Sequence, residues 1–347
     1  MYLQSRFPSA LRSRHLLDHR RRWIVLACAL TAMSLPANGS WAADPAKADK
    51  KSERKIAKKE EGPAKPEEVE LVTNDRLRLA LTYYPGDQGK ETVPIVLLHM
   101  WKQSRADYKD LAVYLQSQGY AVVVPDLRGH GQSTHFKGAR RDSELRAATM
   151  PMRQFGAMVT QDMKAVKDFL WEENDAGRLN LDKLCVVGAE MGASVALEFA
   201  GFDAVGYDYG RLYYGPLKLG GFVKALVLIS PEWTFKGLSL RQVASIRRVQ
   251  RDLAVLILVG KKDTRALKNA KRVNDFFERY HPEPGGNDRI DRKTLFFIRL
   301  DTSLQGTKLL DPKLEVPAII SAFVARRLVN SEEAHDWVWK NRKRPHE

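Results

Sequence analysis

One short segment of this sequence places a carboxylate where a reactive side chain is usually found. Residues 188–192 read Gly-Ala-Glu-Met-Gly, directly after the apolar run at residues 184–187 and directly before a helical pattern. Glycines on both sides of a central residue allow a strained turn between a strand and a helix, which lifts the central side chain above the sheet. A serine at the centre of such a turn acts as a nucleophile, whereas this turn carries Glu190.

Apolar runs on the N-terminal side of this turn predict a parallel sheet. Residues 93–99 and 120–125 are continuous apolar runs, typical of strands buried on both faces, and residues 105–118 between them have helical spacing. Strand, helix and strand in this order make a βαβ unit. The second strand leads into residues 126–133, Asp-Leu-Arg-Gly-His-Gly-Gln-Ser. Together with residues 188–192, this segment resembles the α/β-hydrolases, many of which carry Asp-x-Arg-Gly-His-Gly-x-Ser after the fourth strand.

The rest of the chain continues in the order that the resemblance implies. Further strands are predicted at residues 184–188, 225–230, 253–260 and 293–300, and helices at residues 158–171, 192–202, 264–280 and 315–329. A hairpin at residues 69–72 and 77–84 precedes them. The predicted fold class is therefore α/β: an α/β-hydrolase fold with a mostly parallel eight-stranded sheet and helices on both faces, formed by residues 67–330.

The resemblance implies a catalytic triad in the order nucleophile, acid, histidine, on loops at the carboxyl ends of the strands. Glu190 stands at the nucleophile position. Residues 259–263, Val-Gly-Lys-Lys-Asp, place Asp263 at the acid position. Where the family often has His-Gly after the eighth strand, this chain has Gln305-Gly306. Because an amide does not exchange a proton near neutral pH, Gln305 at the histidine position cannot act as the base.

The loop after the strand at residues 93–99 also departs from the family pattern. Members commonly have His-Gly and small residues there, so that backbone N–H groups face the developing negative charge. This chain has a methionine at the glycine position. We assign five residues to the oxyanion loop and pocket: His99, Met100, Trp101, His130 and Met191. Two altered triad positions and an altered loop predict a hydrolase scaffold without ordinary serine-hydrolase activity.

Three roles of Glu190 stay open. The carboxylate can lie at the N-terminus of the helix beginning near Met191, where the helix dipole and free N–H groups favour it. It can instead act as a nucleophile or base with His99 or His130, because haloalkane dehalogenases and epoxide hydrolases on this scaffold use an aspartate here. Finally, Glu190 and Asp263 can bind a cation together. Lysines on neighbouring loops are expected instead to neutralise these carboxylates: Lys102, Lys261, Lys262 or Lys308. We expect no metal site and no cofactor.

The two ends of the chain differ in composition from the predicted domain. Residues 1–42 are predicted to be a signal peptide, with arginines between residues 12 and 22, an apolar stretch at 23–35 and Ser-Trp-Ala before a cleavage point. Residues 43–66 are rich in Lys, Glu, Ala and Pro and predict a disordered charged linker. Residues 331–347 are predicted to be a polar C-terminal tail. We therefore expect export to the periplasm or the cell exterior, with no transmembrane segment after cleavage.

Charge and cysteine content restrict the partners. The net charge is +15, but the basic residues are scattered and no nucleic-acid-binding motif accompanies them. An anionic envelope polymer or a small-molecule ligand is the expected partner, and nucleic acid is not. Of the two cysteines, Cys28 lies in the predicted signal peptide and Cys185 in a strand, so that the mature chain has no internal disulfide.

The sequence thus predicts an exported α/β-hydrolase-fold protein. By family it is a hydrolase of ester or acyl bonds, but we expect a pseudo-hydrolase with a binding or scaffold role. The alternative is an active hydrolase that uses Glu190 with His99 or His130. The loops at residues 134–154 and 202–221 are expected to shape the mouth of the pocket.

Overall fold

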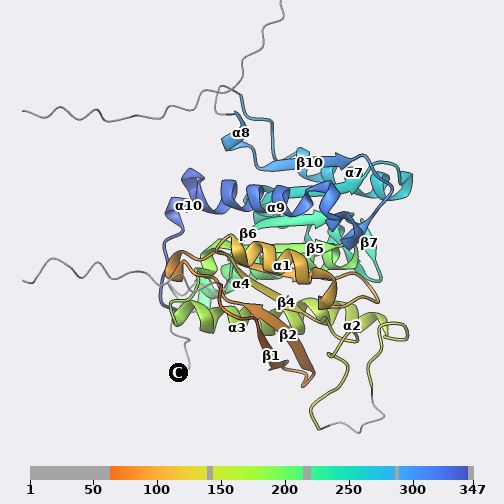
Figure 1. Ribbon diagram of the computed structural model, residues 1–347, viewed down its shortest axis with the longest axis vertical. Coiled ribbons are helices and arrows are strands. Elements are labelled where there is room, and N and C mark those ends of the chain that lie inside the picture. Colours follow the sequence, from red (N-terminus) through yellow and green to blue (C-terminus); the bar gives the residue numbers. More distant parts are fainter. Residues whose placement is uncertain (1–62, 139–143, 214–219, 286–288, 343–347) are drawn as a thin grey trace, which may run out of the picture. The chain divides into compact units, whose positions relative to one another are not determined.

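The computed structural model describes residues 63–138, 144–213, 220–285 and 289–342 (Figure 1). The chain divides into two units, Met1–Lys58 and Lys59–Glu347, and every described residue belongs to the second. The predicted signal peptide and most of the predicted linker therefore lie outside the described residues, and export stays a prediction. Within the described ranges, none of the helices combines the length and apolar character that a membrane span requires.

An eight-stranded sheet in the order β1-β2-β4-β3-β5-β6-β9-β10 forms the centre of the domain (Figure 1). β1 and β2 form an antiparallel hairpin, β2 pairs antiparallel with β4, and all later neighbours are parallel. This arrangement confirms the predicted fold class. The strands are β1 (Glu67–Val72), β2 (Arg78–Tyr84), β3 (Pro94–Leu98), β4 (Ala121–Pro125), β5 (Leu184–Ala189), β6 (Val223–Ile229), β9 (Ala254–Gly260) and β10 (Leu295–Leu300). A separate short hairpin pairs β7 (Thr234–Phe235) with β8 (Leu238–Ser239).

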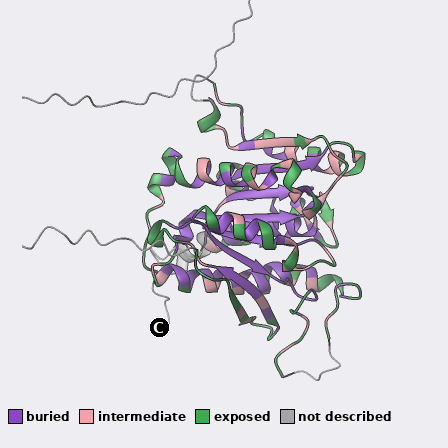
Figure 2. Cartoon of the chain, in the orientation of Figure 1, coloured by how far each residue is buried: buried purple, intermediate pink, exposed green. Residues whose placement is uncertain are grey.

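Helices cover both faces of this sheet, so the central strands are buried throughout (Figure 2). The α-helices are α1 (Lys109–Ser117), α2 (Met152–Ala157), α3 (Met163–Asp175), α4 (Met191–Tyr213), α5 (Leu240–Val243), α6 (Arg247–Arg251), α7 (Thr264–Glu278), α8 (Arg289–Arg292), α9 (Val316–Val324) and α10 (Glu332–Asp336). Along β3 the side chains alternate between two apolar clusters, with Ile95 and Leu97 on the face of α1 and α9, and Val96 and Leu98 on the face of α3, α4 and α7. The 3₁₀ and π segments are η1 (Gly89–Glu91), η2 (Arg105–Tyr108), η3 (Met158–Asp162), η4 (Leu181–Lys183), η5 (Gly306–Leu310), η6 (Pro312–Leu314) and η7 (Ala325–Val329).

The helix after the glycine-flanked turn is longer than the sequence suggested. We predicted a helix at residues 192–202 followed by a loop, but α4 continues to Tyr213. Gly201 and Gly206 lie inside it, because a glycine in a helix costs only about 1 kcal/mol relative to alanine and does not end a helix by itself. The predicted mouth loop at residues 202–221 is therefore wrong for its first half, and its side chains from residue 207 to 219 lie outside the described part of the structure.

The C-terminal residues pack against the domain. The indole N–H of Trp171 donates to the carbonyl of Arg342 at 2.6 Å, and Asn174 Nδ2 donates to the carbonyl of Lys340 at 2.9 Å. In return, Trp339 Nε1 donates to the carbonyl of Asn174 at 3.0 Å. Residues 339–342 thus lie along α3, and the predicted polar tail is part of the folded domain as far as residue 342.

Burial raises the pKa values of two side chains, one on β5 and one on α4. Cys185 is the only cysteine among the described residues, and burial in β5 raises the pKa of its thiol. Glu198 on α4 is also buried, and its Oε1 accepts a hydrogen bond from the Ser239 backbone N–H at 2.5 Å. Burial raises the pKa of Glu198 to about 7, although this hydrogen bond opposes the shift.

We expect Glu198→Gln to change how stability depends on pH. Because its folded-state pKa lies above the ordinary value, the native state binds more protons than the unfolded chain between about pH 4.5 and pH 7. The free energy of unfolding of the wild type therefore falls by up to about 3 kcal/mol through this group as the pH rises through that window. The glutamine keeps an acceptor for Ser239, so the variant should be the more stable protein at pH 8.

Urea unfolding at pH 5 and pH 8 measures this difference. Glu278→Gln, an exposed carboxylate on α7, is the matched control and should follow the wild-type pH dependence. Parallel pH profiles for wild type and Glu198→Gln would contradict the expectation.

Candidate functional site

The turn between β5 and α4 holds Glu190 in a left-handed backbone conformation, with φ 47°. Its backbone N–H donates to the carbonyl of Ile229 at the end of β6, at 2.9 Å. The flanking glycines are sterically required. A Cβ on Gly192 would overlap the Leu98 carbonyl oxygen and lie 2.8 Å from the His99 oxygen, and a Cβ on Gly188 would overlap the Gly192 carbonyl. The start of α4 therefore lies directly against the end of β3.

The carboxylate of Glu190 is half-buried among other acidic groups. Burial is the main cause that raises its pKa, and the charges of Glu232 and Asp263 raise it further, while Lys308 opposes them. Within the described part of the chain no hydrogen bond reaches this carboxylate, so it does not accept the free N–H groups of α4 as one of our predictions required. It lies instead beside η5, since a Cβ on Gly306 would come within 2.9 Å of Oε1.

The amide of Gln305 is held by groups at the ends of β6 and β9. Its Oε1 accepts from the Ser230 hydroxyl at 2.6 Å, and its Nε2 donates to the Gly260 carbonyl at 2.9 Å. The Ser230 oxygen in turn accepts from the Gly306 backbone N–H at 2.9 Å. Gln305 therefore ties the loop before η5 to the sheet, which an amide can do because it donates and accepts at once.

Asp263 caps a helix. Its Oδ1 accepts from the backbone N–H groups of Arg265 and Ala266, both at 3.0 Å, at the start of α7. Among the described residues, no hydrogen bond joins the carboxylate of Asp263 to Gln305 or to Glu190. The three positions that the resemblance grouped as a triad lie at the same edge of the sheet but do not form a relay.

Met100 fills the space beside the turn. Its side chain is buried, and its sulfur accepts from the Thr307 backbone N–H at 3.4 Å. The same sulfur lies where a Cβ on Gly306 would stand. Met191, which follows Glu190, is fully buried in the core. Side chains thus occupy the space next to the predicted oxyanion loop.

The two histidines at this edge, His99 and His130, contact backbone groups. His99 Nδ1 contacts the Met100 carbonyl at 2.8 Å, and its Nε2 accepts from the Leu127 N–H at 3.0 Å. Burial, with the neighbouring His130 as a second cause, lowers the pKa of His99 to about 3, so this ring stays neutral at physiological pH. His130 Nδ1 contacts the Arg128 carbonyl at 2.9 Å, whereas its buried Nε2 has no partner among the described residues. Burial also lowers the pKa of His130.

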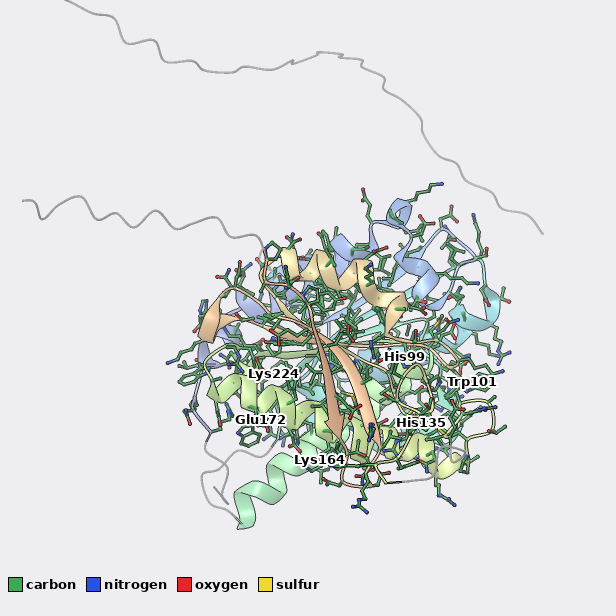
Figure 3. All side chains as sticks on the ribbon, turned by 60° about the horizontal axis from the view of Figure 1, so that its bottom comes forward. His99, Trp101, His135, Lys164, Glu172 and Lys224 are labelled. Carbon is green, nitrogen blue, oxygen red and sulfur yellow. The ribbon has the colours of Figure 1, made fainter. Side chains whose placement is uncertain are left out.

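Trp101 and three of the four predicted lysines point to other partners. The Trp101 indole donates to the Ala147 carbonyl at 3.2 Å, and the Lys102 and Lys236 ammonium groups lie 4.4 and 4.0 Å from its ring centroid. Trp101 and His99 are labelled at the same end of the domain in Figure 3. Lys261 and Lys262 both pair with Asp301, at 3.4 and 3.3 Å. Of the four lysines considered for neutralising the site, Lys308 is the one whose charge acts on Glu190.

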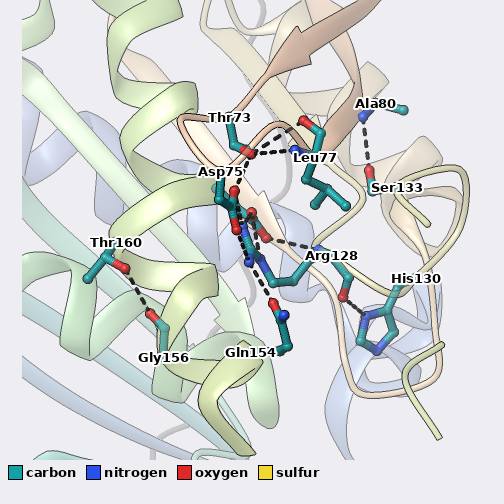
Figure 4. Close-up of polar contacts among 11 residues, drawn as sticks. Thr73, Asp75, Leu77, Ala80, Arg128, His130, Ser133, Gln154, Gly156 and Thr160 are labelled. Atoms are coloured by element: carbon teal, nitrogen blue, oxygen red, sulfur yellow. Dashed lines mark hydrogen bonds and ion pairs between the residues drawn. The ribbon is translucent and has the colours of Figure 1, made fainter. Parts of the chain in front are cut away.

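A buried ion-pair cluster fixes the segment at residues 126–133. The Arg128 guanidinium is fully buried and contacts Asp162 at 2.7 Å. It also contacts Asp75 at 2.8 Å, as Figure 4 shows. The Arg128 Nη1 also donates to Gln154 Oε1 at 2.7 Å. The Asp162 carboxylate additionally accepts from the Arg128 backbone N–H at 2.9 Å. This cluster therefore connects β4 to the turn of the β1–β2 hairpin and to η3.

Sequence reasoning missed two residues of this edge, Ser230 and Glu232. Both follow β6 at its carboxyl end, which is the position that the parallel-sheet argument singles out for site residues. Glu232 is half-buried, and burial raises its pKa while Arg265 opposes the shift. Within the described ranges, no group of three or more His, Cys, Asp or Glu side chains is arranged to hold a metal ion.

The parallel sheet, the glycine-flanked turn and its helix define an α/β-hydrolase fold. Residues 90–280 match the model of the family described as serine aminopeptidase, S33, and the chain belongs to this family. No curated protein matches the sequence.

Solved structures agree on the fold. The chain is similar to the Pf2001 esterase of Pyrococcus furiosus, with 16% identity and a TM-score of 0.52, covering 76% of this chain and 93% of that one. It is also similar to a dienelactone hydrolase of Anabaena variabilis, with 16% identity and a TM-score of 0.50, covering 76% of this chain and 98% of the other. At this identity the likeness shows the fold alone.

Proposed function

We propose that this protein is an exported member of the S33 family that no longer hydrolyses ester or acyl bonds and that serves as a binding or scaffold protein. The observation that carries the proposal is the hydrogen bonding of Gln305, whose amide is fixed between Ser230 and Gly260 at the position where the family has its general base. A serine-type mechanism needs a nucleophile, a proton acceptor and an orienting acid in mutual contact. Here Glu190 has no such acceptor, and Asp263 caps α7.

The alternative, a carboxylate enzyme, has one observation in its favour. The Nε2 atom of His130 is buried without a partner among the described residues, and a free imidazole nitrogen is what a general base requires. Against it, Met100 occupies the space beside Glu190, and the His130 ring lies against that of His99, tilted by 56° with the ring centroids 4.9 Å apart. Hydrolysis of an ester formed on Glu190 would also need a general base that activates a water molecule next to the ester carbonyl.

Hydrolysis of short p-nitrophenyl esters tests the proposal. We expect purified wild type and Glu190→Gln to turn over at the same rate as buffer, because loss of an entire triad removes on the order of 10⁶-fold in kcat. The Glu190→Ser/Gln305→His double variant restores a nucleophile and an imidazole on the same scaffold and should exceed that background. A wild-type rate that disappears in Glu190→Gln would contradict the proposal and establish the carboxylate enzyme.

A further inference from the structure

A groove lies on the face of the sheet that α1 and α9 cover. Residues of η5 line one side of this groove, and Gly306 at the start of η5 also lies next to Glu190. The two helices pack on the same face of the sheet (Figure 1). The groove has a volume of about 690 Å³ and lies between η2 and α1 on one side and η5, η6 and the start of α9 on the other. Pockets that bind drug-sized ligands usually enclose 300–1,000 Å³, so its size suits a small organic molecule.

The groove is lined by both apolar and acidic side chains. Six apolar residues, called the floor below, come from both sides: Leu111, Tyr114, Leu304, Leu310, Pro317 and Ala318. Four carboxylates, called the rim below, line it as well: Asp107, Asp110, Asp311 and Glu315. Lys308 is the single basic side chain among the described lining residues. In a chain of net charge +15, this concentration of negative charge is local to the groove.

The rim carboxylates have no cationic partner in the described structure. Asp107 accepts from the Thr307 hydroxyl at 3.2 Å, and Asp311 accepts from the Lys313 backbone N–H at 2.9 Å, but neither forms an ion pair. For the carboxylates of Asp110 and Glu315 the described residues supply neither a hydrogen bond nor an ion pair. Burial raises the pKa of Asp107, and the hydrogen bond from Thr307 opposes the shift.

The spacing of these groups argues against a metal ion and in favour of an organic cation. Within the described ranges, acidic side chains do not converge as metal ligands do. They are distributed around an apolar surface instead. A ligand that fits both features has an alkyl or aryl body for the floor and an ammonium group for the rim.

We propose that this groove is a binding site for a small organic amine, held by burial of its apolar body and by the charges of Asp110 and Glu315. Lys308 is shared between the groove and the surroundings of Glu190, so a ligand cation would lie close to the turn without contacting it. The site is separate from the altered triad. It does not depend on whether Glu190 has catalytic activity.

Calorimetric titration of the full chain with n-hexylamine at pH 7, with 1-hexanol as the uncharged analogue, tests this proposal. We expect saturable binding of hexylamine, binding of hexanol at least tenfold weaker, and a loss of at least tenfold in hexylamine affinity for Asp110→Asn/Glu315→Gln. Both side chains are exposed, so this variant should fold normally. The control Asp275→Asn/Glu278→Gln removes the same charge from α7, on the opposite face of the sheet, and should bind within twofold of wild type.

Three results would overturn the proposal: no saturable heat with hexylamine, equal affinity for hexanol, or equal losses in the two double variants, which would mean diffuse attraction. A filling variant, Ala318→Trp, should abolish binding of both compounds, and unchanged binding in it would also exclude this groove. Ester turnover, measured separately, reports only on the triad positions. Failure of the proposed function and failure of the amine site are therefore distinguishable.

Discussion

Replacing Gly192 with alanine should destabilise the domain by about 3 kcal/mol, the upper end of what overpacking usually costs. The added Cβ would overlap the Leu98 carbonyl oxygen and lie 2.7 Å from the Leu98 carbonyl carbon. Both are backbone atoms at the end of β3, where no flexible side chain can move aside. Relief requires α4 to shift away from the sheet, and this would also separate Glu190 from its backbone hydrogen bond to Ile229.

Gly156→Ala is the matched control for this substitution. Gly156 is exposed on α2, and a Cβ there would have nothing within 4 Å. Alanine is the better helix former by about 1 kcal/mol, so this variant should be equal to or more stable than wild type. Thermal and urea unfolding of both variants checks the pair. A Gly192→Ala protein with wild-type stability would show that the turn does not need the close approach described above.

The second large effect is expected from Arg128→Met. This substitution removes the cation that compensates Asp162, and it leaves a carboxylate with no exposed side-chain surface facing an apolar group. Breaking a buried pair from one side costs about 3–5 kcal/mol. We expect a loss in that range by urea unfolding, together with loosening of the β1–β2 turn through Asp75.

A double-mutant cycle separates the ion pair from simple loss of packing. Arg128→Met/Asp162→Asn should be less destabilised than the sum of the two single variants, because the second change removes the uncompensated charge. The control is Arg146→Met, which removes a largely exposed arginine paired with Glu144 and should cost less than about 0.5 kcal/mol. Strict additivity in the Arg128–Asp162 cycle would contradict a coupled pair.

The sheet could be predicted because its strands are short apolar runs between turn signals, which leave few alternatives. Residues 94–98, 121–125 and 254–260 are buried on both faces, and such strands can be recognised in a sequence as continuous apolar runs. The length of α4 could not be predicted, because glycines at 201 and 206 are ordinarily signs of a helix end, yet α4 continues through both. The packing of residues 339–342 on α3 rests on long-range hydrogen bonds that no local pattern encodes.

The candidate site was predictable in position but not in its contacts. Motif spacing places Glu190, Asp263 and Gln305 at one edge of the sheet, and the structure has them there. Motif spacing does not predict that the Gln305 amide bonds to Ser230 after β6 and to Gly260 at the end of β9. Nor does it predict that the sulfur of Met100 lies against Gly306. These arrangements depend on side-chain orientation across loops far apart in the sequence. The groove beside η5 was missed because its acidic residues come from separate segments, 107–110 and 311–315.

The single buried thiol of the described residues also provides a probe of local opening, because its reaction rate with a thiol reagent depends on how often it becomes exposed. Cys185 lies in the middle of the sheet with no exposed surface, and its raised pKa leaves almost no thiolate in the native state. A thiol reagent can therefore modify it only after the elements that cover β5 move away. In a Cys28→Ser background, the labelling rate measures how often the structure around β5 opens under native conditions, and it can be compared between wild type and the variants discussed above.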